Sequence, residues 1–378
     1  MGKVLILGGY GNFGKRIAEA LIRSNVPVII AGRDLIKAQS LADRLKAMVP
    51  NAEVGSAFVN IDDGLIEALK NLSPKIVVNT VGPFQGQDYH VARACIAAGI
   101  HYIDLADGRE FVTGIARLDD QAKAENLCVI SGASTVPGLS SAVVERYRSQ
   151  FAVIETMMYG ISPGQKAERG LATTKGILSY VGKKLKPARG QWGARYGWQD
   201  IYRQTYPELG VRWMANCDVP DLDLLPEAYG IKSIRFSAGL EHPLLHLGLW
   251  GLSWLVRIGL PLKLERHAAL MLRMSDLFNG LGTADGGMHV ILRGTDADGQ
   301  MREVRWFIIA RNGDGPQIPC VPAIILARWL AQEDGAALPI EVGAKACVGL
   351  VNIDDYLVEL SRFNIETYVW IDGVQRLG

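Results

Sequence analysis

The amino-acid sequence predicts an α/β protein, with a doubly wound parallel sheet in its N-terminal part and a second α+β domain whose sheet is mixed or antiparallel. Short apolar runs alternate with helical patterns through residues 1–132, as in strands joined by crossover helices. Further along, two alternating runs, 288–293 and 303–311, flank a turn at 296–299, which predicts an antiparallel hairpin. At 378 residues, 49% of them hydrophobic and 21% charged, the chain is long and apolar enough for two or three folded domains.

The charge balance and the cysteines indicate the surroundings of the protein. With 40 basic and 39 acidic residues the formal net charge is +1, so we expect no nucleic-acid partner. The five cysteines lie far apart, without a C-x-x-C pair or a zinc-ligand grouping, and we predict no metal site. Glycines follow too soon after Met1 for a secretory signal peptide. We therefore expect a reducing, cytoplasmic environment.

A glycine-rich turn stands between the first predicted strand, 3–7, and the first predicted helix, 15–23. Gly9, Gly11 and Gly14 match the G-x-G-x-x-G fingerprint, whose glycines permit a tight turn, close approach of the backbone to a pyrophosphate, and close packing of helix on strand. A structural turn without a ligand is the alternative. The flanking strand and helix favour a dinucleotide site of the Rossmann type. We predict cofactor contacts from Gly8, Gly9, Tyr10, Gly11, Asn12, Phe13 and Gly14.

The tip of the second predicted strand, 27–31, indicates which dinucleotide binds. NAD enzymes usually place an Asp or Glu there, about twenty residues after the fingerprint, whereas this chain has Gly32 and Arg33. A guanidinium can pair with a 2′-phosphate, so the cofactor is predicted to be NADP rather than NAD. Asp34 follows directly and has two interpretations: a further contact to the cofactor, or the cap of the next predicted helix.

The alternation of strands and helices continues to residue 130. Strands are predicted at 57–61, 75–81, 101–105 and 127–130, and helices at 63–72, 89–98 and 110–125. Because ligands bind at the carboxyl ends of such strands, we expect Asp62 near the adenine. By the same rule Gly82, Pro83 and Phe84 belong beside the nicotinamide ribose. An ordinary turn at the end of a strand is the alternative for Gly82 and Pro83.

Four segments, in this order and spacing, resemble the saccharopine dehydrogenase family, which includes saccharopine reductase and saccharopine dehydrogenase-like oxidoreductases. They are the glycine loop 8–14, the stretch 79–84 with the helix bearing Ala94 and Cys95, the stretch 99–105, and the turn 132–139. The resemblance implies an NADP-linked hydride transfer, often at a carbon–nitrogen bond of an amino-acid-type substrate. Many members carry a Glu shortly after the Asp that matches Asp104; here Asp107 or Glu110 could substitute. The resemblance therefore does not extend to saccharopine as the substrate.

The same resemblance suggests how the domains are built. Residues 343–364 are similar to a C-terminal loop and helix that pack back on the nucleotide domain in such enzymes. We expect a dinucleotide-binding domain of residues 1–132, completed by 343–364, and a substrate and dimerisation domain of residues 133–342. A homodimer is the expected assembly.

A basic segment follows the predicted strand 153–161. Between residues 163 and 213 there are ten basic and three acidic side chains, an excess of seven. A solvated helix and loop would account for most of them, and an anion site for a carboxylate-bearing substrate is the functional interpretation. Arg169 and Lys175, nearest the end of the predicted strand, are the candidates for binding the substrate.

The most apolar run of the chain is 244–256. It is shorter than the roughly 20 residues of a membrane-spanning helix, so we predict no transmembrane span. A core helix is one interpretation; an exposed helix would have to meet a membrane surface, a second subunit or a lipid-like substrate. His242 and His246 have the spacing of metal ligands, but Pro243 between them and the missing Glu of H-E-x-x-H argue against a metal.

Hydride transfer at an imine or carbonyl also needs a proton donor. The candidates are His101, Asp107, Tyr159 and Lys175, each of which also has a structural interpretation. The predicted function is an NADP-dependent oxidoreductase of a small-molecule substrate. Two alternatives remain: a nucleotide-binding scaffold or sensor that associates with a membrane or partner through 244–256, and a reductase of lipid-like substrates.

Overall fold

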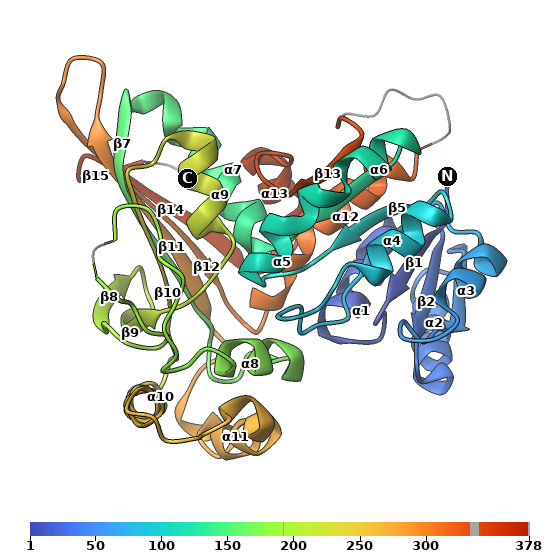
Figure 1. The fold of residues 1–378 in the computed structure, drawn as a ribbon, viewed down its shortest axis with the longest axis horizontal. Coiled ribbons are helices and arrows are strands. Elements are labelled where there is room, and N and C mark those ends of the chain that lie inside the picture. The colour runs from blue at the N-terminus through green and yellow to red at the C-terminus, as the bar shows by residue number, and fades with distance from the viewer. Residues whose placement is uncertain (192, 333–339, 377–378) are drawn as a thin grey trace. The chain divides into compact units, whose positions relative to one another are not determined.

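The computed structural model describes residues 1–191, 193–332 and 340–376. The chain divides into two compact units (Figure 1). The first contains Met1–Leu139 and Gln317–Tyr356, and the second contains Ser140–Pro316 and Leu357–Gly378. The chain thus leaves the first unit and returns to it near its C-terminus.

A parallel sheet forms the centre of the first unit. Its seven strands in the described residues are β1 (Val4–Leu7), β2 (Val28–Gly32), β3 (Val54–Phe58), β4 (Ile76–Asn79), β5 (His101–Asp104), β6 (Cys128–Ser131) and β13 (Gly343–Ala346). Their order is β13-β6-β5-β4-β1-β2-β3, and every pairing is parallel. The order reverses at β1, which lies between β2 and β4. The predicted doubly wound sheet is confirmed, and its switch point lies where β1 ends in the glycine loop.

Helices cover the sheet of the first unit. They are α1 (Asn12–Arg23), α2 (Leu35–Met48), α3 (Leu65–Leu72), α4 (His90–Ala97), α5 (Arg109–Thr113), α6 (Asp119–Ala124) and α12 (Val321–Leu330), with shorter helical turns η1 (Gly114–Leu118) and η2 (Thr135–Leu139). Helix α12 packs against α1 and against strands β4 and β5. The helices thus bury both faces of the sheet. Leu5, Val77 and Val129 lie in the core on one face, and Ile6, Val78 and Ile130, the next residues along the same strands, are buried on the other.

The helix predicted over residues 110–125 is interrupted and consists of α5, η1 and α6. The hydroxyl of Tyr89 donates a hydrogen bond of 2.7 Å to the carbonyl of Phe111, a group that a continuous α-helix would use internally. A Cβ on Gly114 would lie 2.4 Å from that same hydroxyl. The side chain of Tyr89 therefore interrupts the helix at Gly114.

A mixed sheet of eight strands, counted over the described residues, forms the second unit. The strands are β7 (Val153–Ser162), β8 (Tyr202–Tyr206), β9 (Gly210–Asn216), β10 (Ser233–Ala238), β11 (Gly286–Thr295), β12 (Met301–Ala310), β14 (Ile365–Ile371) and β15 (Val374–Arg376). Their order is β15-β14-β12-β11-β7-β10-β9-β8, and only the β7–β10 pair is parallel among these strands. The predicted hairpin is β11–β12, with Asp296 accepting hydrogen bonds from the N–H groups of Asp298 and Gln300 in its turn. The second domain has the predicted mixed sheet.

The helices of the second unit are α7 (Ser140–Tyr147), α8 (Leu171–Leu178), α9 (Asp221–Tyr229), α10 (Pro243–Arg257) and α11 (Ala268–Asp276), with short turns η3 (Arg148–Gln150), η4 (Leu264–His267) and η5 (Asn279–Leu281). Two further elements, η6 (Gly315–Cys320) and α13 (Ile353–Leu360), carry the chain from one unit to the other. In α10, Pro243 occupies the first turn, a position that tolerates proline, so the helix begins there undisturbed.

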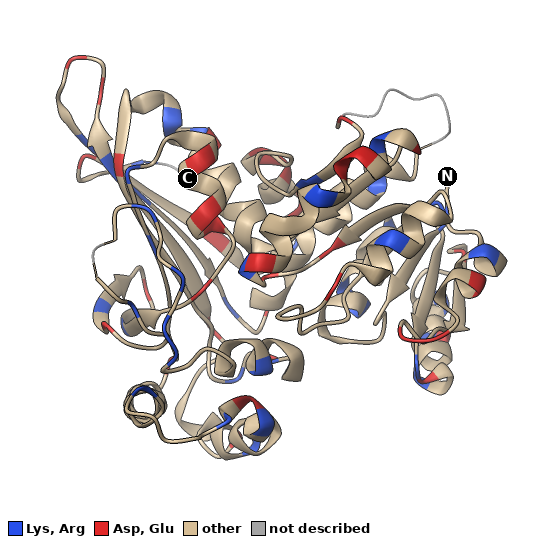
Figure 2. Cartoon of the chain, viewed as in Figure 1, with Lys and Arg blue, Asp and Glu red and all other residues tan. Residues whose placement is uncertain are grey.

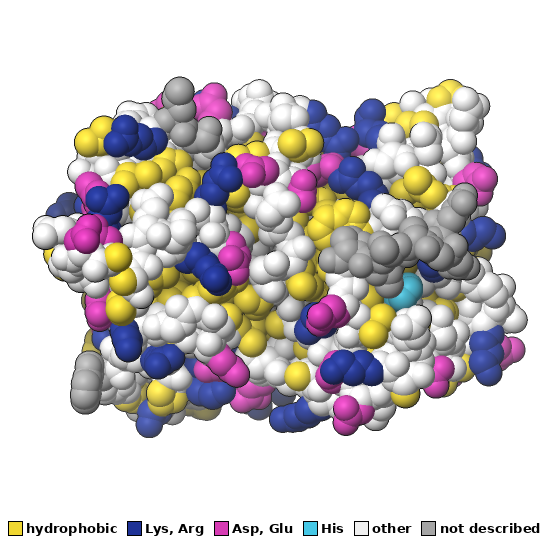
Figure 3. Space-filling model, turned by 90° about the horizontal axis from the view of Figure 1, so that it is seen from above, with side chains coloured by type: hydrophobic (Ala, Val, Ile, Leu, Met, Phe, Trp, Pro, Cys, Tyr) yellow, Lys and Arg dark blue, Asp and Glu magenta, His cyan; other side chains and the backbone are white. Residues whose placement is uncertain are grey.

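Acidic and basic side chains are interspersed along the chain (Figure 2). The face drawn in Figure 3 likewise mixes charges of both signs with hydrophobic side chains, in agreement with the net charge of +1. Within the described ranges, none of the helices is both long and apolar enough to cross a bilayer.

Candidate nucleotide-binding and active site

The glycine loop after β1 is so tightly folded that side chains would not fit. Gly8 has a φ of +73°, a conformation that favours glycine, and its carbonyl accepts a 2.8 Å hydrogen bond from the N–H of Gly11. A Cβ on Gly9 would lie 2.9 Å from the carbonyl oxygen of Ile6. A Cβ on Gly14 would lie 2.5 Å from the carbonyl oxygen of Gly8, so this glycine allows α1 to approach the loop. The loop is a closely packed cradle of backbone.

Helix α1 begins directly after this loop, with Gly11 at its N-cap and no side chain capping it. The first N–H groups of a helix form a site for an anion, which the helix dipole reinforces. The guanidinium of Arg16 donates to the carbonyl of Asn12 at 2.5 Å and also contacts its side-chain oxygen, which places a positive charge beside the first turn. The geometry and the charge both suit a diphosphate.

Tyr10 joins the glycine loop to the tip of β2. Its ring lies against Gly32, where a Cβ would come within 2.6 Å of it, and its hydroxyl accepts a 3.1 Å hydrogen bond from the N–H of Asp34. The carboxylate of Asp34 caps α2, accepting from the N–H of Lys37 at 3.0 Å, and pairs with the Lys37 ammonium at 3.2 Å. These contacts lower the pKa of Asp34. Arg33 is exposed and, within the described residues, makes no hydrogen bond or ion pair.

The loop after β4 lies at the same edge of the sheet. The hydroxyl of Thr80 donates to the carbonyl of Leu7 at 2.8 Å and so fixes the end of β4 to the end of β1. The peptide bond between Gly82 and Pro83 is cis, and the Gln87 side chain donates to the Pro83 carbonyl at 2.7 Å. Phe84 is buried, with its ring 5.3 Å from that of Phe111. The predicted residues 82–84 thus form a fixed loop beside the switch point.

Asp62 lies in the exposed turn that follows β3, at the carboxyl end of this edge strand. Its N–H donates to the side chain of Asn60 at 3.2 Å. It is therefore at the same edge as the glycine loop, on the side of β2 and β3.

Asp107 lies in the loop after β5 and connects this loop to the one after β4. The side-chain amide of Gln85 donates to Asp107 Oδ1 at 3.1 Å. Burial raises the pKa of Asp107 above that of an exposed aspartate. Asp107 could also have been the cap of the helix that follows, but the N-cap of that helix is Gly108.

Sequence patterns did not reveal the role of Asp104, at the end of β5. One carboxylate oxygen accepts hydrogen bonds of 2.9 Å from the N–H of Ala106, the hydroxyl of Ser131 and the N–H of Gly132. Burial raises its pKa to about 6 in spite of these bonds. The signals in the sequence were an acidic residue at the end of an apolar strand and its match to an Asp of the family that the chain resembles. In the structure Asp104 joins the ends of β5 and β6, and so supports the loops at this edge.

The first unit is similar to a known family of domains. Residues 4–131 match the family model described as the saccharopine dehydrogenase NADP binding domain. This segment is similar to that family. The match spans six of the seven strands described in the parallel sheet; the seventh, β13, comes from the C-terminal part of the chain. No curated protein matches the chain.

Solved structures extend the likeness to the whole chain at the level of the fold. The apo saccharopine dehydrogenase (L-Glu forming) of Saccharomyces cerevisiae aligns with a TM-score of 0.65 at 12% identity, over 98% of this chain and 100% of the yeast chain. A short-chain oxidoreductase of Pseudomonas aeruginosa aligns over 40% of this chain and 82% of its own, at 10% identity and a TM-score of 0.31. A short-chain dehydrogenase/reductase of Mycobacterium marinum aligns over 34% and 72%, at 13% identity and 0.30. Only the yeast enzyme shares the overall fold among these three.

The other predicted proton donors are His101 in the first unit and Tyr159 and Lys175 in the second. His101 begins β5 of the first unit and thus stands at the sheet edge opposite to the glycine loop, where its Nδ1 accepts from the N–H of Cys128 at 3.0 Å. Tyr159 is fully buried in β7 of the second unit, with its ring 4.8 Å from that of Phe236. Lys175 is exposed on α8. Of the two candidates in the first unit, His101 and Asp107, only Asp107 lies at the edge that carries the glycine loop.

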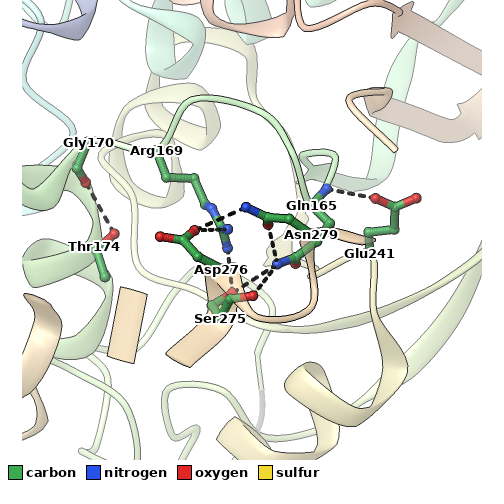
Figure 4. A network of polar contacts seen from close by, with 8 residues as sticks. All are labelled: Gln165, Arg169, Gly170, Thr174, Glu241, Ser275, Asp276 and Asn279. Atoms are coloured by element: carbon green, nitrogen blue, oxygen red, sulfur yellow. Dashed lines mark hydrogen bonds and ion pairs between the residues drawn. The ribbon is translucent and has the colours of Figure 1, made fainter. Parts of the chain in front are cut away.

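Arg169, predicted to bind a substrate anion, is held by α11 (Figure 4). Its guanidinium donates to the hydroxyl of Ser275 at 2.7 Å and pairs with Asp276 at 3.2 Å. These partners lie more than 100 residues further along the chain, where no local pattern could indicate them. His242 and His246 do not gather with other ligands: among the described residues no group of three or more His, Cys, Asp or Glu side chains could hold a metal ion.

Proposed function

We propose that the protein is an NADP-dependent oxidoreductase that transfers a hydride to or from a small molecule, at a carbon–nitrogen bond of an amino-acid-type substrate. The glycine cradle supports this proposal most directly, because its backbone is packed so closely that Cβ atoms on Gly9 and Gly14 would collide with it. The start of α1 beside it has no side-chain cap. This is what a bound pyrophosphate requires of a Rossmann loop. The family of residues 4–131 supports the same cofactor.

We assign the 2′-phosphate of NADP to Arg33. The guanidinium is exposed at the tip of β2, and no partner for it exists in the described part of the chain. The neighbouring carboxylate of Asp34 is engaged by the cap and by Lys37, so its negative charge is largely balanced. An unengaged cation beside a neutralised acid favours a ligand with the additional phosphate.

The remaining cofactor residues follow the order of the strands. Asp62, after β3, is assigned to the adenine side, and residues 82–84, after β4, to the nicotinamide side, because β1 and β2 lie between them in the sheet. Bound NADPH supplies the hydride. The chain supplies position: Thr80 and Gln87 hold the loop that would orient the nicotinamide ribose.

We assign the proton to Asp107. Its raised pKa means that the carboxyl keeps its proton to a higher pH than an exposed aspartate, which is what a general acid needs. The amide of Gln85 fixes one carboxyl oxygen and thereby orients the group. Tyr159 and Lys175 are the candidates that the second unit would contribute, and Lys175 and Arg169 those for binding a substrate carboxylate.

Thermal unfolding with added nucleotide tests this proposal, because a ligand that binds the folded state raises the melting temperature. We expect NADPH to stabilise the protein much more than NADH, and Arg33→Ala to remove most of that difference. Arg44→Ala, an exposed arginine on α2, is the matched control and should leave it unchanged. Equal stabilisation of the wild type by both nucleotides would contradict the assignment of Arg33. If the protein bound NADPH but did not oxidise it in the presence of any imine formed from a 2-oxo acid and an amine, a nucleotide-binding scaffold would be favoured instead.

A further inference from the structure

Between β10 and β11 the chain forms a helical excursion, residues 239–285, which contains α10, η4, α11 and η5. Its two ends are joined by Glu241, whose carboxylate accepts hydrogen bonds from the N–H and the hydroxyl of Thr283, at 3.0 and 2.9 Å. The same carboxylate accepts from the N–H of Gln165 at 2.7 Å and pairs with the buried Arg212 at 3.2 Å. The excursion therefore starts and ends at one fixed point.

Polar contacts also fix the far part of the excursion (Figure 4). The Gln165 side chain donates to the Ser275 carbonyl at 2.7 Å and to the Asn279 side chain at 3.1 Å. Arg169 bonds Ser275 and Asp276 from the same loop. On the inner side, Leu249 of α10 and Leu264 of η4 pack in a core with Trp198. These contacts hold the helices in place, so the side chains on their outer side form one fixed surface.

That outer surface is apolar along α10. Leu244, Gly248, Gly251, Leu255 and Ile258 follow one another at spacings of four, three, four and three residues, which is one stripe of a helix. Leu244 is 67% exposed and Ile258 is 71% exposed. The stripe contains no charged residue.

The apolar surface continues through the connection into α11. Leu260 and Leu262 are exposed in the connection. Leu270, Met274 and Leu277, spaced by four and three residues, are exposed along α11, and Leu277 is 82% exposed. Two helices and their connection thus show leucine, isoleucine and methionine side chains to the outside, where polar residues are usual.

The charges around this surface are of one sign. No acidic residue occurs from His242 to Leu264, whereas Arg257, Lys263, Arg266 and Arg273 are all exposed. Of the two acids in the excursion beyond its ends, Asp276 is paired with Arg169 and Glu265 is half-buried. Because neither acid is available to these cations, a binding partner has to supply the negative charge.

We propose that this surface, the outer side of α10 and α11 with their connection, binds the face of a membrane that contains anionic phospholipid. Helix α10, with 15 residues, is about 22 Å long, too short to cross a bilayer but suited to lie in its interface. Trp254, partly exposed beside Arg257, is of the residue type that prefers this depth. The exposed cations match phosphate headgroups.

A second copy of the chain fits this surface less well. In a two-fold symmetric contact the same surface is present on both sides, so Lys263, Arg266 and Arg273 would meet a surface that carries the same cations. Anionic lipid pairs every one of these cations.

Flotation of the full-length protein with vesicles tests the proposal. We expect it to float with vesicles of phosphatidylcholine and phosphatidylglycerol, and much less with phosphatidylcholine alone. Ile258→Glu and Leu277→Glu should each weaken binding about tenfold or more, because each replaces an inserted apolar side chain with a charge. Val358→Glu, at a residue that is 73% exposed on α13, is the control and should bind as the wild type does.

The positions are exposed, so the variants should fold and keep their affinity for NADPH, which separates this proposal from that of the cofactor site. A wild type that does not float with the mixed vesicles would overturn the proposal, as would unchanged binding by Ile258→Glu and Leu277→Glu. If light scattering instead showed a dimer that Ile258→Glu dissociates, without binding to vesicles, the surface would be a contact between copies and the membrane proposal would be wrong.

Discussion

The hydroxyl of Tyr10 accepts a hydrogen bond from the backbone N–H of Asp34 at 3.1 Å, and its ring lies against Gly32. One side chain of the glycine loop thus fixes the tip of the neighbouring strand. The proposed sites for the diphosphate and for the 2′-phosphate are therefore held in one arrangement before any ligand binds, which lowers the entropic cost of binding.

Tyr10→Phe tests the effect of this contact. The variant keeps the ring on Gly32 but loses a hydrogen bond, which contributes about 0.5–1.5 kcal/mol. We expect the affinity for NADPH to fall by about 2–10-fold, with the melting temperature of the free protein little changed. Fluorescence titration of both proteins with NADPH measures this. An affinity equal to that of the wild type would show that the loop and the strand tip do not depend on this bond.

Gly14→Ala should destabilise the first unit and abolish nucleotide binding, because its Cβ would lie 2.5 Å from the Gly8 carbonyl oxygen. We expect a loss of unfolding free energy of about 1–3 kcal/mol, as for other overpacked sites. The matched control is Gly55→Ala in β3, where the nearest atom to the new Cβ would be Ile29 Cγ1 at 3.8 Å. Chemical denaturation with and without NADPH gives both quantities. If the two variants behaved alike, the loop would be less constrained than its contacts indicate.

Asp107→Asn should lower kcat for reduction by about 10²–10⁴-fold, the range typical of a lost general acid, while NADPH binds as before. Glu125→Gln, an exposed acid directly after α6, is the control and should retain full activity. In the wild type, kcat for reduction should fall as Asp107 loses its proton, at a pH above the ordinary range of an aspartate, because burial raises its pKa. A fully active Asp107→Asn variant with an unchanged pH profile would transfer the role to another group.

Asp221 makes the stability of the second unit depend on pH. It is fully buried in α9, accepts a hydrogen bond from the Ser140 hydroxyl, and burial raises its pKa from 3.8 to about 7. Between these values the folded state holds a proton that the unfolded state has lost, so the free energy of unfolding falls as the pH rises. We expect Asp221 to contribute a fall on the order of 1–3 kcal/mol between pH 4 and pH 7.

Asp221→Asn removes this titration. Measured by denaturation at several pH values, the stability of the variant relative to the wild type should rise from pH 4 to pH 7. Asp298→Asn, in the exposed turn of the β11–β12 hairpin, is the control and should show no such trend. The comparison with the wild type is necessary because two buried histidines also make the stability depend on pH. Burial lowers the pKa of His246 to about 4 and that of His289 to about 3. Below pH 6.5 these histidines therefore make the free energy of unfolding rise with pH, opposite to the effect of Asp221. A constant difference between Asp221→Asn and the wild type would contradict the raised pKa.

Local sequence signals were sufficient for the elements that local forces determine. The run 3–7 and the glycines after it predicted β1, the loop and α1, because strand, turn and helix there follow each other within twenty residues. The same holds for the β11–β12 hairpin, whose turn is closed by its own residues.

Elements that depend on distant contacts were not predicted. Helix α12 is buried on nearly all sides and so has no amphipathic pattern, although it packs on α1. The break at Gly114 depends on the hydroxyl of Tyr89, which lies at the start of α4. The same limit applies to function: Arg169 was predicted from its charge and its position after the predicted strand, whereas its partners Ser275 and Asp276 lie on α11.

Isothermal titration calorimetry of the folded wild-type protein with NADPH and with NADH tests the central claim most directly. We expect NADPH to bind with one site per chain and NADH to bind at least about tenfold more weakly, because only NADPH offers a phosphate to Arg33. A protein that is folded by circular dichroism but gives no binding heat and no competition with either nucleotide would contradict the claim that the loop between β1 and α1 holds a dinucleotide.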